Sequence, residues 1–233
     1  MAGAVVAVSG YDDMTGLAGL LLSVEPFALP VVYLDGAHEL YHREAGGGRW
    51  DRARELANMA APPGVLVTLP ALEDRPWTCE AEKREHLAGW IVEHREVIGS
   101  PDWILWLDDD ERLEGSPPAL AQALEMSRGL DWLDVNLWRP DHTHAPQGFD
   151  HPRIMAVQPG ITFDRGYSWV ARLNGERFAY KHGERVSKRY DGCVVSLSPD
   201  IVRIRHERRA RTAERLRTQG RYKARRAALE GRV

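Results

Sequence analysis

The stretch Asp102-Trp103-Ile104-Leu105-Trp106-Leu107-Asp108-Asp109-Asp110-Glu111-Arg112-Leu113 decides the fold of this chain. Large apolar residues occupy positions 103–107 and a proline precedes them at 101, a pattern typical of a buried strand. Aspartate has a poor strand propensity, so we expect the strand to end where the acids begin. The sequence therefore predicts a cluster of carboxylates at the carboxyl end of a buried strand.

The adjacent acids at positions 108–111 repel one another unless a positive charge lies among them. Mg²⁺ and Mn²⁺ prefer hard carboxylate oxygens, so the sequence favours a divalent cation at this turn. The alternative is a solvated acidic turn, which is the usual interpretation of an arbitrary run of aspartates. The apolar strand that precedes the acids weighs against that alternative here.

The segment from Leu107 to Leu113, with its Asp-Asp-Asp-Glu core, resembles the Asp-x-Asp-Glu stretch of nucleotide-sugar glycosyltransferases with the GT-A fold, in the large family-2-like group. The resemblance implies an α/β fold, with a Rossmann-like mixed sheet flanked by helices. It implies a divalent metal, Mn²⁺ or Mg²⁺, that holds the diphosphate of a donor, with a UDP-sugar favoured. It spans roughly residues 4–222 and is specific only at 102–113. We expect a catalytic domain over 1–207 and a basic C-terminal helix or tail over 208–233.

The order of the remaining elements agrees with an α/β sheet. Short apolar segments, together with an alternating apolar and polar pattern at 132–138, predict strands at 4–8, 30–35, 65–69, 132–138, 153–157, 159–163, 169–173 and 202–206. Helical patterns occupy 15–24, 52–59, 79–98, 119–126 and 208–229, with Thr15 and Thr78 as expected N-caps of the first and third helices. Strands that alternate with helices favour parallel βαβ units, and ligands bind at the carboxyl ends of such strands.

Within this resemblance the acids have distinct expected roles. Asp110 is the first metal ligand, and Asp108 either ligates the metal or binds the ribose. Because side chains alternate along a strand, Asp109 is expected to point away from Asp108 and Asp110, and it is a candidate catalytic residue. Glu111 is expected to support the metal ligands without binding the metal. His206, at the end of the last predicted strand, is a further metal ligand by resemblance. A lone histidine is otherwise a core or surface residue.

Residues at the ends of the first strands and on the third helix are expected to bind the nucleotide sugar. Asp35 is also interpretable as a turn former before a glycine, and the basic pair at 83–84 as surface partners of neighbouring glutamates. The nucleotide-sugar candidates are Ser9, Tyr11, Asp35, Lys83, Arg84 and Asp108.

A general base is required if the transfer inverts the configuration of the sugar. Glu176 is the expected base because it follows a segment that resembles the acceptor side of these transferases, and Asp164 and Glu184 are its rivals. A retaining reaction needs no such base. Trp138 and Trp169 are interpretable either as platforms for a sugar ring or as core residues.

Charge is distributed unevenly along the chain, whose formal net charge is -3. From 203 to 232 there are twelve Lys/Arg against three Glu, a balance of +9, so the remainder carries -3 - 9 = -12. A basic segment on an acidic body predicts an anionic partner. Arg208, Arg209 and Arg211 are the candidates for nucleic-acid contact. The alternative is a solvated helix that folds back on the acidic body.

Two other functions compete with glycosyl transfer. A nucleotidyltransferase predicts a glycine-rich, basic phosphate loop after the first strand, whereas 9–13 is acidic. A nucleic-acid-binding module would act through the arginine-rich C-terminus, but the acidic body argues against that as the whole function. Within the transferase hypothesis the acceptor stays open among a glycan, a protein, a small molecule and a modified DNA base.

Composition fits one ordinary domain: 233 residues, of which 43% are hydrophobic. Only two cysteines occur, Cys79 and Cys193, and they match no metal or redox spacing, so we expect a cytoplasmic protein. No apolar run reaches the length of a membrane span, and we expect no membrane-spanning segment.

Overall fold

The computed structural model describes residues 3–11, 13–51, 56, 66–138, 148–164, 167–173, 176–181, 184–186, 195–207 and 213–229. Its helices are α1 (Met14–Val24), the 3-10 helix η1 (Glu25–Phe27), α2 (Glu39–Glu44), α4 (Glu80–Glu93), α5 (Pro117–Met126) and α6 (Ala213–Leu229). Its strands are β1 (Ala4–Ser9), β2 (Val31–Leu34), β3 (Leu66–Leu69), β4 (Trp103–Leu107), β5 (Glu111–Gly115), β6 (Trp132–Trp138), β7 (Phe149–Ala156), β8 (Ile161–Asp164), β9 (Tyr167–Leu173), β10 (Glu176–Lys181), β11 (Glu184–Val186), β12 (Val195–Ser196) and β13 (Val202–His206).

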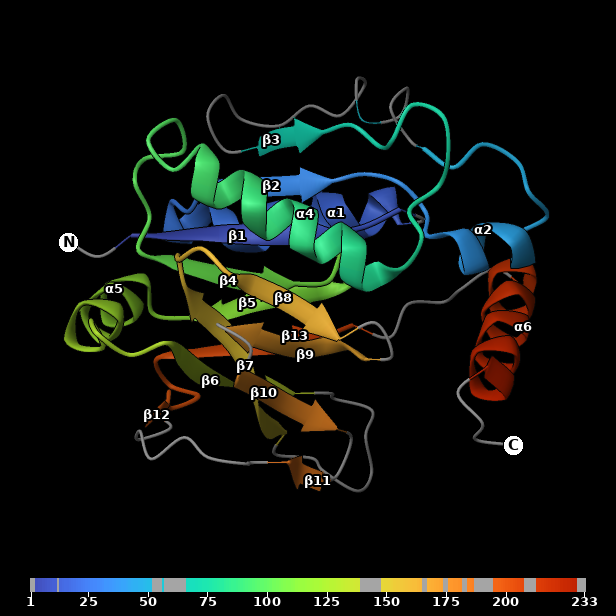
Figure 1. The fold of residues 1–233 in the computed structure, drawn as a ribbon. Helices are drawn as coiled ribbons and strands as arrows, with labels where there is room; N and C mark the ends of the chain where they lie inside the picture. Colours follow the sequence, from blue (N-terminus) through green and yellow to red (C-terminus); the bar gives the residue numbers. More distant parts are fainter. Residues whose placement is uncertain are drawn as a thin grey trace.

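A mixed central sheet forms the body of the molecule (Figure 1). Its strands lie in the order β3-β2-β1-β4-β7-β6-β13-β5, and β12 adds to β6. β3, β2, β1 and β4 are parallel, whereas β7 runs antiparallel to both β4 and β6. The predicted α/β class, a mixed sheet flanked by helices and compatible with a Rossmann-like fold, is confirmed.

Strand β4 supplies side chains to both faces of this sheet. Trp103, Leu105 and Leu107 join the hydrophobic core that contains α1 and α5, while Ile104 and Trp106 join the core that contains α4. Figure 1 shows α4 in front of the sheet and α1 behind it. Since both faces are covered, β4 is a continuous apolar run instead of an alternating one, which is the pattern of buried parallel strands.

The order in which strands are added to the sheet reverses at β1. From β1 the chain passes to β2 and then β3 on one side, and it returns to β4 on the other side. Ser9 pairs with Leu34 and Val8 with Leu107, so the carboxyl ends of β1, β2 and β4 lie level. Such a reversal leaves a crevice between the loops that follow the strands, and α/β proteins bind ligands there.

A smaller sheet of order β11-β10-β9-β8 lies against α4. The backbone N–H of Phe163 in β8 donates to Glu85 of α4 at 2.8 Å. The Phe163 ring meets the Trp106 ring edge to face, with centroids 5.3 Å apart. These contacts attach the second sheet to α4, the helix that carries Lys83 and Arg84, and to β4 of the central sheet.

Several predicted boundaries were wrong. Asp13, not Thr15, caps α1, because its carboxylate accepts the Gly16 N–H at 2.7 Å. Helix α4 ends at Glu93, and hydrogen-bonded turns replace the rest of the predicted helix to 98. Thr78 does not cap it: its N-cap is Cys79, which makes no capping hydrogen bond through its side chain. Helix α2 and strand β5 were not predicted.

We expect Gly115→Ala to lower the free energy of unfolding by about 1–3 kcal/mol. Gly115 has a φ of +137°, and an added Cβ would lie 2.3 Å from the Ile201 carbonyl oxygen, within the β5–β13 pairing. Urea denaturation measures the change. Gly129→Ala is the matched control, because Gly129 also has a positive φ of 90° but open space around it. Equal losses in both variants would show that the close approach contributes nothing.

Candidate active site

A fully buried carboxylate holds the acidic turn that follows β4. One oxygen of Glu111 accepts the backbone N–H of Asp108 at 2.8 Å, and the other accepts Arg153 Nη2 at 2.7 Å. Arg153 also donates to the Trp106 carbonyl at 3.3 Å. Burial raises the pKa of Glu111, and the Arg153 guanidinium opposes that rise. Glu111 is therefore a structural anchor of the turn.

The three aspartates held by this anchor lie against different partners. Asp108 accepts Arg84 Nη2 at 3.1 Å. Asp109 lines a hollow beside the ends of β1 and β2. Asp110 is 8% exposed and lies beside His206, with 3.5 Å between its Oδ2 and the imidazole Nε2. The three aspartates of the turn therefore lie in three different environments.

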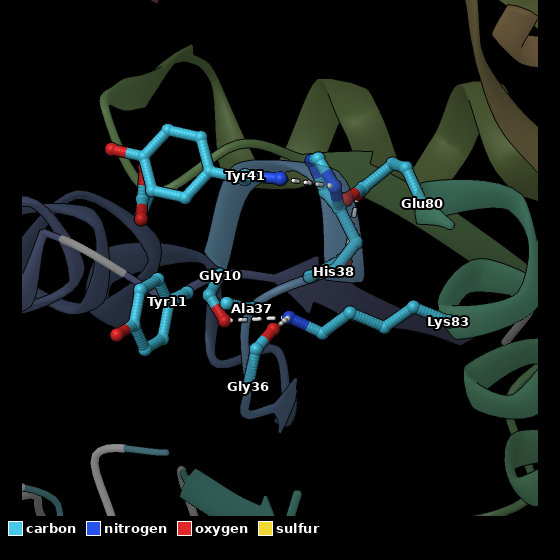
Figure 2. Close-up of a pocket in the computed structure, with 10 residues that line it drawn as sticks. Gly10, Tyr11, Gly36, Ala37, His38, Tyr41, Glu80 and Lys83 are labelled. Atoms are coloured by element: carbon cyan, nitrogen blue, oxygen red, sulfur yellow. Dashed lines mark hydrogen bonds between the residues drawn. The ribbon is translucent and has the colours of Figure 1, made fainter. Parts of the chain in front are cut away.

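The hollow has a volume of about 150 Å³ and opens at the carboxyl edge of the sheet, where Figure 2 shows its side chains. That volume is below the roughly 300–1,000 Å³ of ordinary ligand pockets, so it suits one part of a ligand, such as a base or a ribose. It lies at the reversal between β1 and β4. Its walls are Ser9, Gly10, Tyr11, Gly36, Ala37, His38, Tyr41, Glu80, Lys83 and Asp109.

Lys83 joins the loops that follow β1 and β2. Its ammonium donates to the carbonyls of Gly10 and Gly36, both at 2.6 Å, as Figure 2 shows. The side chain is only 2% exposed, and burial lowers its pKa to about 8. Two of the three ammonium donors are thus used by the backbone. Lys83 shapes the floor of the hollow, which the sequence alone did not indicate.

A chain of polar contacts links β1 to the acidic turn. Ser9 donates to Glu80 at 2.9 Å, Arg84 donates to the same glutamate oxygen at 3.2 Å, and Arg84 then reaches Asp108. The Arg84 guanidinium also lies 5.6 Å from the centre of the Trp106 ring. Arg84 pairs with Glu80 and lies at the edge of the site, but it is buried, so its interpretation as a surface residue was wrong.

His206 reaches the turn through strand pairing. β13 runs antiparallel to β5 and places His206 opposite Glu111. The backbone N–H of Glu207 donates to the Asp110 carbonyl at 2.9 Å, and the Glu207 carboxylate pairs with Arg112 at 2.9 Å. The two predicted metal ligands, distant in sequence, are therefore neighbours in the fold.

The Asp110–His206 pair fits the protein side of a divalent-metal site. Two neighbouring ligands, each about 2.1 Å from Mg²⁺ or Mn²⁺, lie about 3 Å apart in octahedral geometry, close to the observed separation. Within the described part of the chain no three His, Cys, Asp or Glu side chains form a group able to hold a metal. The pair suits a cation that takes its other ligands from substrate phosphates and water, as Mg²⁺ often does.

Aromatic side chains form one rim of the hollow. Tyr41 meets Tyr11 edge to face at 6.2 Å, and Tyr222 of α6 lies 5.1 Å from His38 and 5.8 Å from Tyr41. The sequence analysis did not identify His38, Tyr41 or Tyr222. The clustering of aromatic residues directly after the second strand was the available signal.

Other predicted residues have different positions. Asp35 is 1% exposed, lies outside the wall of the hollow, and accepts Trp77 Nε1 at its carbonyl, 2.9 Å away. Trp138 is covered by the Arg203 guanidinium, 4.8 Å from the ring centre. The backbones of Glu176, Asp164, Glu184 and Trp169 belong to the small sheet, and their predicted roles stay predictions. Arg208, Arg209, Arg211, Cys193 and most of the predicted helix at 52–59 lie outside the described residues.

Comparisons with known proteins place the chain in no group. No family model matches it, and no curated protein matches it. Among the described residues, no helix combines the length and the apolar character needed to cross a membrane.

We expect the stability difference between the native chain and Lys83→Met to depend on pH. The pKa of Lys83 falls from 10.5 to about 8 on folding, so between these values the unfolded chain binds more protons. The free energy of unfolding of the native chain therefore rises relative to the variant by roughly 3 kcal/mol from pH 8 to 10.5. Urea titrations across this range measure it, and a constant difference would contradict it.

Arg153→Met should destabilise the protein by about 3–5 kcal/mol, because the Glu111 carboxylate is left buried and unpaired. Glu111→Gln/Arg153→Met should regain more than about 1 kcal/mol of that loss, since the charge is then removed. Chemical denaturation of both variants measures how much stability the double variant regains. Arg128→Met, at an exposed arginine paired with Asp102, is the control and should change stability by less than about 1 kcal/mol. A double variant no more stable than Arg153→Met would refute the pairing argument.

Proposed function

We propose that this protein is a metal-dependent glycosyltransferase of the GT-A type, which transfers a sugar from a nucleotide-diphosphate sugar to an acceptor hydroxyl. One observation carries the proposal: Asp110 lies beside His206 at the carboxyl end of β4, next to a hollow at the reversal of the sheet. A carboxylate and an imidazole at that position suit a cation bound to a diphosphate.

The hollow is the proposed site of the nucleoside. Glu80 and Asp109 offer carboxylate acceptors to ribose hydroxyls or to base N–H groups, and Tyr11 and Tyr41 offer ring faces and edges. The diphosphate would then extend toward Asp110 and His206, with Arg84 beside Asp108 available for charge compensation. The UDP-sugar expectation still rests on the sequence resemblance.

The reaction breaks the bond between the anomeric carbon and the diphosphate oxygen, and it forms a bond between that carbon and the acceptor oxygen. The electron pair of the broken bond leaves with the nucleoside diphosphate. When bound, a divalent cation acts as a Lewis acid on that leaving group. Asp110 and His206 would hold the cation. Glu111 and Arg153 act at a distance, because they fix the turn that presents Asp110.

The acceptor proton needs a base in an inverting reaction. Glu176 remains the proposed base, with Asp164 and Glu184 as alternatives on the same small sheet, which packs against α4. Of the three aspartates in the turn, Asp109 lines the hollow, so it is proposed to contact the donor. A nucleotidyltransferase would use the same crevice but would release diphosphate instead of a nucleoside diphosphate. Identifying the released product therefore distinguishes a glycosyltransferase from a nucleotidyltransferase.

We expect the native chain to be stabilised by UDP with Mn²⁺ and to release UDP slowly from a UDP-sugar. Ligand at about 100 times its dissociation constant adds about 2.7 kcal/mol to stability. Asp110→Asn should abolish the Mn²⁺-dependent part of the shift and slow UDP release by at least about a hundredfold, since a metal contributes several kcal/mol to the transition state. Thermal unfolding and a coupled assay of UDP measure the two effects.

Asp200→Asn is the matched control, because it removes the same charge from an exposed aspartate after β12. It should leave both the shift and the rate unchanged. If Asp110→Asn keeps the full metal-dependent shift and rate, the proposed function is wrong. Other nucleoside diphosphates in the same assay identify the base of the donor.

A further inference from the structure

Helix α6 presents exposed cations between Arg217 and Arg225. The exposed cations described on this helix are Arg217, Arg221, Lys223 and Arg225. The other exposed residues described on it are glycine and alanine. They belong to the C-terminal segment with a charge balance of +9, on a body that carries -12. The acidic body repels polyanions. A polyanion is therefore attracted mainly to the exposed cations of this helix.

The same helix is attached at the rim of the hollow. Tyr222 contacts His38 and Tyr41, both of which line the hollow. Arg221 donates to the Glu44 carbonyl of α2 at 2.7 Å. Figure 1 shows α6 below α2 at the end of the molecule where the parallel strands terminate. The cations of α6 are therefore held beside the proposed donor site instead of at a remote surface.

We propose that α6 is the docking surface for a nucleic-acid acceptor, whose phosphate backbone it binds beside the donor site. This inference rests on the proposed function and names its acceptor class. Lys and Arg neutralise phosphates without reading sequence, and Arg contacts them in a bidentate manner. The target hydroxyl of the nucleic acid is then held beside the transferable sugar.

A nucleic acid fits this surface better than a membrane does. A helix that binds a lipid surface combines its cations with large apolar side chains that enter the bilayer. The described exposed side chains of α6 include no large apolar one, and the exposed large apolar residues of the described chain are Leu22, Val97 and Met126, all on other elements. The exposed cations described on α6 fit electrostatic attachment to phosphates.

The test is the salt dependence of binding to short fluorescent DNA, both single-stranded and duplex, by anisotropy. Lys223→Gln/Arg225→Gln should reduce the slope of log K against log salt by about 0.9 for each lost contact with duplex, or about 0.7 with a single strand. Arg95→Gln/Arg128→Gln removes the same charge at the opposite, amino end of β4, beside Asp102, and should leave the slope unchanged.

Thermal shifts with UDP and Mn²⁺ in the same variants separate this inference from the proposed function. Weaker DNA binding with an intact UDP shift supports the docking surface. DNA binding that is unchanged in Lys223→Gln/Arg225→Gln overturns it, while an intact UDP shift leaves the transferase proposal standing. DNA binding through α6 in a chain that shows no nucleotide shift overturns the acceptor role. Tighter binding to anionic lipid vesicles than to DNA also overturns it.

Discussion

The buried contact between Glu111 and Arg153 is the interaction on which the candidate site depends. A carboxylate with no exposed surface is costly unless it is paired, and here it has both a guanidinium and a backbone N–H as partners. Through that N–H the contact fixes Asp108, and through Arg153 it reaches the Trp106 carbonyl at the end of β4. A buried charge pair thus sets the geometry of the acidic turn, whose Asp108 and Asp109 are half-buried.

The fold reduces the repulsion among the clustered carboxylates of that turn by placing them against different partners. Asp108 meets Arg84, Asp110 meets His206, and Asp109 faces the hollow that Lys83 supports from below. Lys83 keeps the loops after β1 and β2 together by binding one carbonyl from each. The reversal of strand order at β1 leaves room for the crevice, and Lys83 forms part of its wall.

The sequence predicted much of the fold because its signals are local. Strands β1 and β4 are apolar runs, and β6 and β13 alternate apolar with polar residues, so all four can be identified without their neighbours. Strand β5 was missed because Glu111-Arg-Leu-Glu-Gly115 has no such run, and its pairing with β13 makes it a strand. Helix α2 is six residues long with no buried face, so it left no periodic pattern.

By itself, the sequence determined that a buried strand ends in four acids, because apolar burial and the poor strand propensity of aspartate act within a few residues. It also determined that the positive charge gathers at the C-terminus. Only the tertiary structure decided which groups meet those acids. His206 reaches Asp110 through β13, Arg153 reaches Glu111 through β7, and Tyr222 reaches His38 through α6. Such contacts join segments distant along the chain, so strand order and packing set them, and no local pattern encodes them.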